Sequence, residues 1–134
     1  MKLLIAGSRS LDSDSVLRDK KKSYIVDDII SILDLFPKTV IHGDCSKGPD
    51  SWAKQYCRDF SVREDRYPAD WDNLGRGAGH IRNGEMAKVA DELLLIWDGV
   101  SKGSENMKNR MLKLNKPVYE IIIKTHNIEE EDLI

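Results

Sequence analysis

The sequence predicts an α/β protein with a Rossmann-like three-layer sandwich, in which a central five-stranded parallel sheet of order 3-2-1-4-5 carries helices on both faces. Two observations lead to this fold class. Short apolar runs of strand length alternate along the chain with segments whose apolar residues recur at helical spacing. Strict alternation of strands and helices is typical of a parallel sheet built with right-handed crossover connections.

Each expected strand has a local signal. The run from Leu93 to Trp97 is uninterrupted and apolar, as in a strand buried on both faces of a parallel sheet. The run at 2–6 is of the same kind and is closed by Gly7, whereas the segment 62–67 alternates only weakly. The expected strands span 2–6, 39–42, 62–67, 93–97 and 118–123.

Four segments have the spacing of helices. The first spans 23–36 and ends before Pro37, and its expected apolar face is Ile25, Ile29, Ile32, Leu33 and Phe36. The second begins at Pro49, a residue that suits the first helical position, and runs to Phe60. The third spans 81–90, with an expected apolar face of Ile81, Met86, Val89 and Ala90. The fourth runs from about 103 to 114, while 11–22 is expected to be a loop or a frayed helix start and 67–83 a series of turns.

Length and composition fit one domain over 1–120, followed at 121–134 by the end of the last strand and an acidic C-terminal tail. The first apolar run is too short for an export signal or a membrane helix, so we expect a cytoplasmic protein without membrane contact. A formal net charge of −2 argues against sequence-independent DNA binding. Cys45 and Cys57 are expected to be free thiols, and three scattered histidines offer no metal site.

In a parallel sheet, ligands bind beyond the carboxyl ends of the strands, near the point where the strand order reverses. The loops at that edge are 7–10, 43–50, 68–83 and 98–104. In the first of them, Gly7 permits close approach of a ligand and Arg9 can fork onto a phosphate or carboxylate. The alternative is a tight turn with an exposed arginine.

The last of these loops precedes a helix, so the backbone N–H groups of Gly103 and Ser104 are candidates for binding an anion. Lys102 adds a positive charge beside them. The alternative is that Ser101 or Ser104 serves only as an N-cap. Because this loop and the first loop flank the expected switch point, we expect them to share one crevice.

The second loop has the glycine spacing of a Walker A motif between Gly43 and Gly48. Pro49 and Asp50 stand where that motif has its lysine and hydroxyl residue, so the spacing is coincidental. Asp50 is better suited to binding ribose hydroxyls, or to holding the loop by accepting backbone N–H bonds. Arg82 is expected in a first helical turn, where the helix dipole disfavours a cation. It would therefore need a ligand or a carboxylate such as Asp70 or Asp72, unless it is a surface arginine.

Short motifs follow one another in order from residue 1 to about 120: Gly7-Ser8-Arg9, Gly43-Asp44 through Gly48-Pro49-Asp50, Pro68-Ala69-Asp70-Trp71, Gly79 through Arg82-Asn83 and Met86, Trp97-Asp98-Gly99, and Ser101-Lys102-Gly103-Ser104. Together they resemble the DUF2493/YspA-like proteins of the SLOG superfamily, relatives of the DNA-processing protein DprA and of the LOG phosphoribohydrolases. The resemblance implies a domain that binds a nucleotide or nucleotide derivative, and it implies a homo-oligomer.

The loops and the resemblance together predict the ligand-binding residues, and no certain cofactor beyond the nucleotide. They are Gly7, Ser8, Arg9, Gly43, Asp44, Gly48, Asp50, Asp70, Trp71, Arg82, Asn83, Asp98, Gly99, Lys102, Gly103 and Ser104.

Two other functions stay open. The motif around Arg82 looks like the one in which LOG enzymes carry a catalytic arginine, so the chain could hydrolyse a nucleotide N-glycosidic bond, with Asp70, Asp98 or Glu105 as the acid partner. The sequence departs from the LOG pattern at Met107, where that pattern has a glutamate. It departs from the glycine-rich second loop of the DUF2493/YspA-like proteins at Asp44 and Pro49. The third option is DprA-like binding of single-stranded DNA, with bases stacked on Trp52, Trp71 and Tyr67.

Overall fold

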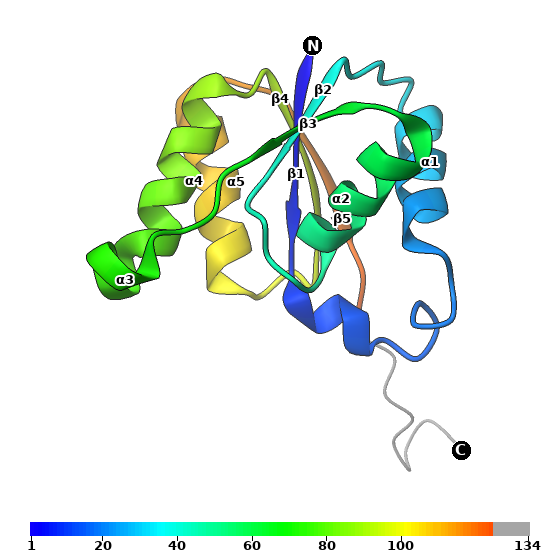
Figure 1. The fold of residues 1–134 in the computed structure, drawn as a ribbon, viewed down its shortest axis with the longest axis horizontal. Helices are drawn as coiled ribbons and strands as arrows, with labels where there is room; N and C mark the ends of the chain where they lie inside the picture. Colours follow the sequence, from blue (N-terminus) through cyan, green and yellow to red (C-terminus); the bar gives the residue numbers. More distant parts are fainter. Residues whose placement is uncertain (125–134) are drawn as a thin grey trace.

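The computed structural model describes residues 1–124 and contains a five-stranded sheet in the order β3-β2-β1-β4-β5 (Figure 1). Every neighbouring pair of strands is parallel. The predicted fold class and strand order are therefore confirmed. The strands are β1 (Lys2–Gly7), β2 (Thr39–His42), β3 (Arg63–Arg66), β4 (Glu92–Trp97) and β5 (Val118–Ile122).

Helices cover both faces of the sheet (Figure 1). On one face, α1 (Lys22–Ile32) packs against α2 (Pro49–Phe60), and on the other α4 (Ala78–Val89) packs against α5 (Lys102–Lys113). Successive side chains of a strand point to opposite faces. Leu3 and Ile5 of β1 accordingly join the core beneath α1 and α2, while Leu4 joins the core beneath α4 and α5.

The carboxyl ends of the parallel strands lie at one edge of the sheet, and the N-terminus lies at the opposite edge (Figure 1). Met1 is held there, because its carbonyl accepts hydrogen bonds from the N–H groups of Lys38 and Thr39, at 3.0 and 3.5 Å. Among the described residues, no helix is long and apolar enough to cross a membrane. The last ten residues of the expected acidic tail, 125–134, lie outside the described part of the chain.

The first helix is shorter than predicted, and its buried face differs in part from the expected one. It ends at Ile32 because Asp34 takes a left-handed conformation, with φ of 55°, and the N–H of Leu35 bonds to the carbonyl of Ile30. This is a Schellman motif with aspartate in place of the usual glycine. The expected apolar face was wrong in part. Ile29 and Leu33 pack against the core as expected, but Ile32 and Phe36 are 81% and 77% exposed. Val26 and Ile30 are buried instead.

The third helix begins earlier than predicted, at Ala78, although glycines surround its start. Ala78 is fully buried, and this packing outweighs the weak helix propensity of glycine. The expected turn at 67–83 therefore holds a short helix α3 (Trp71–Leu74), a 3₁₀ turn (Gly75–Gly77) and the start of α4. Of the expected apolar face, Met86 and Ala90 are buried, but Ile81 and Val89 are largely exposed.

The remaining elements lie close to their expected positions. Helix α2 has the predicted bounds, and α5 begins one residue earlier than predicted. A 3₁₀ turn, η1 (Arg9–Ser13), overlaps the start of segment 11–22, which was expected to be a loop or a frayed helix start. Strand β3, whose alternation was weak, is a charged strand that pairs with β2 at one end of the strand order. Charged side chains are common on edge strands, because they discourage pairing with other chains.

Candidate functional site

A cavity of about 350 Å³ lies where the strand order reverses, between the ends of β1 and β4. We call it the inner cavity. The first and fourth loops both line it, so the structure brings these two predicted loops into one crevice. Of the predicted ligand residues, the inner cavity is lined by Gly7, Ser8, Arg9, Asp50, Arg82, Asn83, Asp98, Gly103 and Ser104.

Gly7 and Ser8 join the ends of three elements. A Cβ on Gly7 would collide with the carbonyl of Ile96 and would come within 2.5 Å of Pro49 Cγ, so only glycine lets β1, β4 and α2 converge here. The Ser8 hydroxyl accepts a hydrogen bond from the N–H of Asp98 and pairs with the hydroxyl of Ser101, 2.7 Å away. Ser8 thus links the first loop to the fourth.

The fourth loop is organised by the Asp98 carboxylate. It accepts hydrogen bonds from the N–H groups of Val100 and Ser101, at 2.9 and 2.8 Å, and from the Ser10 hydroxyl. Partial burial raises the pKa of Asp98, but these hydrogen bonds outweigh it and hold the pKa below its ordinary value. Asp98 is therefore an ionised carboxylate that shapes the loop, not a proton donor near neutral pH.

Ser101 occupies the N-cap position of α5, but its side chain makes no capping bond because it is paired with Ser8. The first N–H groups of an α-helix have no acceptor within the helix. Gly103 and Ser104, in that first turn, line the inner cavity. Asn83 holds this turn in place, since its amide donates to the carbonyl of Gly103 and to Asn106 Oδ1.

Arg82 lies at the other side of the cavity, as the fifth residue of α4. The expectation that it stands in a first helical turn was therefore wrong, and neither of the two carboxylates considered as partners, Asp70 and Asp72, bonds to it among residues 1–124. Its Nη1 donates to the carbonyl of Gly43, at 2.6 Å, and weakly to that of Tyr67, while Nε donates to Asn83 Oδ1. Arg82 thus ties α4 to the ends of β2 and β3.

Asp50 is a buried carboxyl at the cavity wall. Its Oδ2 accepts a long hydrogen bond from the N–H of Cys45, at 3.4 Å. Of the two roles considered for Asp50, binding ribose hydroxyls or holding the loop, this bond corresponds to the second. Burial raises the pKa of Asp50, although the Cys45 thiol and the charge of Arg82 oppose the shift. Burial, followed by the nearby Asp50, likewise raises the pKa of Cys45, while Arg82 and Arg9 lower it.

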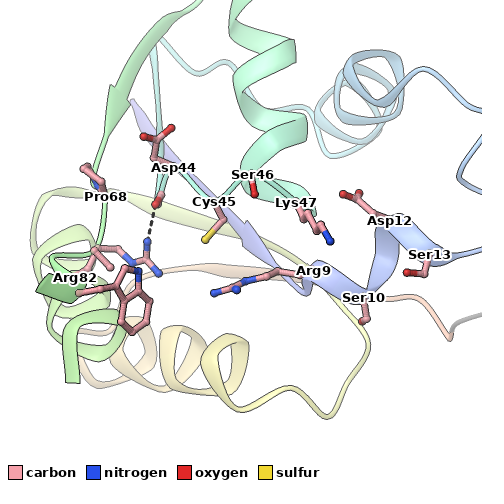
Figure 2. Close-up of a pocket in the computed structure, with 13 residues that line it drawn as sticks. Arg9, Ser10, Asp12, Ser13, Asp44, Cys45, Ser46, Lys47, Pro68 and Arg82 are labelled. Carbon is pink, nitrogen blue, oxygen red and sulfur yellow. Dashed lines mark hydrogen bonds between the residues drawn. The ribbon is translucent and has the colours of Figure 1, made fainter. Parts of the chain in front are cut away.

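A second and larger cavity, of about 890 Å³, opens beside the first. We call it the outer cavity, and the two together the groove. Both cavities are lined by Arg9, Ser10, Cys45 and Arg82, so they adjoin each other. Figure 2 shows the Arg9 side chain extending from the end of β1 toward Arg82. Of the predicted ligand residues, the outer cavity adds Gly43, Asp44 and Trp71.

Asp12 is a structural residue of the site that the sequence did not indicate. Its carboxylate accepts hydrogen bonds from the N–H of Gly48 and from the indole N–H of Trp52, both at 2.9 Å. It lies in a polar segment without periodicity, and both partners are far away in the sequence, so no local pattern marks it. Trp52 is 1% exposed and cannot stack on a base, as one option had supposed.

Five predicted residues do not line either cavity of the described chain: Gly48, Asp70, Gly99, Lys102 and Glu105. Asp70 caps α3, and its carboxylate accepts from the N–H of Asn73. Gly48 and Gly99 have φ of 75° and 85°, which suits glycine in a turn. Lys102 and Glu105 are exposed.

Comparison of the chain with models of protein families, with curated proteins and with solved structures gave no match. The chemistry of the groove is therefore inferred from its own side chains. Within residues 1–124, no group of three or more His, Cys, Asp or Glu is placed to hold a metal ion. The groove instead offers two guanidinium groups and the N-terminus of α5, all of which favour anions.

Proposed function

We propose that the chain binds a nucleotide or nucleotide derivative at the carboxyl edge of its sheet, with the phosphate in the inner cavity. One observation supports this most strongly: Arg9 and Arg82 approach the same cavity that receives the first turn of α5. Arg9 has no hydrogen-bond or ion-pair partner among residues 1–124, so its charge is available to a ligand. A guanidinium group beside a helix N-terminus is well suited to phosphate.

The second loop is a weaker candidate for phosphate, because three of its N–H groups already have acceptors. The N–H of Asp44 donates to His42 Nδ1, that of Cys45 to Asp50, and that of Gly48 to Asp12. Pro49 has no N–H to offer. A P-loop binds phosphates through free backbone N–H groups. The helix end at Gly103 and Ser104 remains the better candidate.

Binding without catalysis fits the groove better than LOG-like hydrolysis. Met107, at the position of the LOG glutamate, is buried in the core beneath α4 and α5. Of the expected acid partners, Asp70 and Glu105 lie outside both cavities, and Asp98 is held ionised by its hydrogen bonds. The motif resemblance to the SLOG superfamily supports a nucleotide as the ligand, and hydrolysis of an N-glycosidic bond is the alternative proposal.

Titration calorimetry with AMP, GMP, CMP, UMP and NAD tests the proposal. We expect at least one of them to bind the wild-type chain, and Arg9→Ala to weaken that binding by about 10- to 150-fold, because a charge-assisted hydrogen bond contributes about 1.5–3 kcal/mol. Arg58→Ala is the matched control, since Arg58 is an exposed arginine in the last turn of α2, away from the groove.

The outcomes of this titration separate the alternatives. Absence of binding by every nucleotide, or equal affinity of the wild type and Arg9→Ala, would contradict the proposed phosphate site. The same samples, analysed by chromatography after incubation, should return intact nucleotide. Free base that appears with the wild type and not with Arg82→Lys would favour the hydrolase.

A further inference from the structure

The groove is larger than a phosphate needs, and its two parts differ in character. The inner cavity is lined by the side chains of Arg9 and Arg82 and by the N-terminal turn of α5. The outer cavity adds an aromatic side chain, Trp71. At about 890 Å³, the outer cavity alone falls within the roughly 300–1,000 Å³ range typical of small-molecule sites. A ligand that places phosphate in the inner part would therefore have room for an attached ring in the outer part.

Trp71 differs from the other two tryptophans of the chain. Trp52 and Trp97 are 1% and 5% exposed, whereas Trp71 is 51% exposed. The indole N–H groups of Trp52 and Trp97 donate to Asp12 and Glu120. The indole of Trp71 donates to no acceptor among residues 1–124. A large aromatic side chain left open to a cavity is well suited to stacking on a ring of the ligand.

The position of Trp71 is supported from two sides. Asp70 caps the short helix that begins at Trp71, because its carboxylate accepts from the N–H and the side-chain amide of Asn73. The indole also lies against Gly79, where an added Cβ would stand 3.3 Å from Trp71 Cη2. Glycine at this position leaves room for the ring beside α4. A ring held in place before binding loses less conformational freedom on binding.

The charges of the outer cavity favour an anionic ligand beside this ring. Its acidic side chains are already engaged: Asp12 accepts from Gly48 and Trp52, and Asp44 forms an ion pair with Lys54. Arg9 lines both parts of the groove, so it would reach a phosphate placed between them. An aromatic surface followed by a partner-free guanidinium is the pattern that a nucleoside phosphate would fill.

We propose that the outer cavity is a base-binding compartment in which the base of a nucleoside phosphate stacks on Trp71. Its phosphate would then extend past Arg9 into the inner cavity. This inference rests on the proposed nucleotide binding and adds the position and the recognition mode of the base.

The test compares AMP and GMP with ribose 5-phosphate, which has the phosphate and sugar but no base. We expect Trp71→Ala to weaken the binding of whichever nucleotide binds by about 5- to 150-fold, and to leave the affinity for ribose 5-phosphate unchanged. Trp71→Phe should restore most of the lost affinity, because phenylalanine keeps an aromatic face. Leu74→Ala is the matched control, since Leu74 is an exposed apolar residue of the same short helix and does not line either cavity.

Tryptophan fluorescence gives an independent readout. Since Trp52 and Trp97 are buried, we expect the nucleotide to protect mainly Trp71 from quenching by acrylamide, and Trp71→Phe to lose this protected signal. Equal weakening of nucleotide and ribose 5-phosphate by Trp71→Ala would overturn the base compartment, as would unchanged nucleotide affinity. If the wild type binds neither nucleotide nor ribose 5-phosphate, the proposed function fails, and the base compartment fails with it.

Discussion

Burial and a neighbouring charge act in opposite directions on the pKa of the Asp50 side chain. It follows Pro49 in the first turn of α2, where a carboxylate suits the helix dipole, yet it is buried at the wall of the inner cavity. Burial penalises the charged form and raises its pKa above the ordinary 3.8, despite the positive charge of Arg82. The folded protein therefore binds this proton more tightly than the unfolded chain does.

This raised pKa predicts a pH dependence of stability. The contribution of protonated Asp50 is fully present below the unfolded pKa of 3.8, and it is lost as the pH rises through the folded pKa. Asp50→Asn does not ionise, so its free energy of unfolding should rise relative to the wild type over that interval. Urea unfolding at a series of pH values measures this difference.

Asp98 supplies the control with the opposite sign. Its folded pKa is lowered, so its contribution to stability is present above 3.8 and is lost as the pH falls through the folded pKa. Asp98→Asn should therefore lose stability relative to the wild type as the pH rises. Parallel slopes for the two variants would show that the burial of Asp50 does not govern its titration.

At the scale of elements, the groove depends on loops that are fixed to one another. Gly48 approaches the first loop so closely that an added Cβ would lie 2.7 Å from the carbonyl of Ser8. Asp12 holds this approach by accepting from Gly48 and from Trp52 of α2. The contact between η1 and α2 thus consists of close backbone packing together with the two hydrogen bonds that the Asp12 carboxylate accepts.

Replacing Asp12 should therefore destabilise the fold as well as the groove. Asp12→Ala would leave two donors without partners, the N–H of Gly48 and the indole N–H of Trp52, at a cost of roughly 2–4 kcal/mol in the free energy of unfolding. Asp12→Asn, which retains an acceptor oxygen, should lose less, and Ser13→Ala on the exposed side of η1 should have little effect. Urea denaturation of the three variants checks this order, and equal stabilities would contradict the role of Asp12.

The five strands and the four longer helices followed from the sequence, but several boundaries and the short helix α3 did not. Periodicity placed a helix before Pro37, yet Asp34 ends it earlier through a left-handed backbone conformation that is uncommon for residues other than glycine. Glycines around Ala78 suggested turns, yet the burial of Ala78 extends the helix across them. Both differences arise from conformations and contacts that no local pattern encodes.

The predicted strand order was the most useful guide to which loops form the candidate site. The rule that ligands bind where strand order reverses correctly grouped Arg9 with Gly103 and Ser104, which are distant in the chain. The partners of individual side chains could not be predicted in this way. Arg82 bonds to two carbonyls instead of a carboxylate, and Asp12 bonds to Trp52, because those pairs depend on how the loops pack.

For the whole molecule, the formal net charge is −2, although cationic side chains line the groove. Strong sequence-independent DNA binding requires a broad basic surface that releases many counterions. We therefore expect no retention of the protein on single-stranded DNA, even at low salt. Retention that falls steeply as salt is added would instead support the DprA-like option. The self-association implied by the motif resemblance stays a prediction.

The position of Met1 has a practical consequence. Its carbonyl is held by Lys38 and Thr39 at the edge of the sheet opposite the groove, whereas β5 ends at Ile122 beside Gly99 of the fourth loop. An affinity tag or a sensor chip joined ahead of residue 1 would leave the groove facing the solution. Immobilisation through the N-terminus is thus the geometry in which surface-based ligand screening has unobstructed access to both cavities.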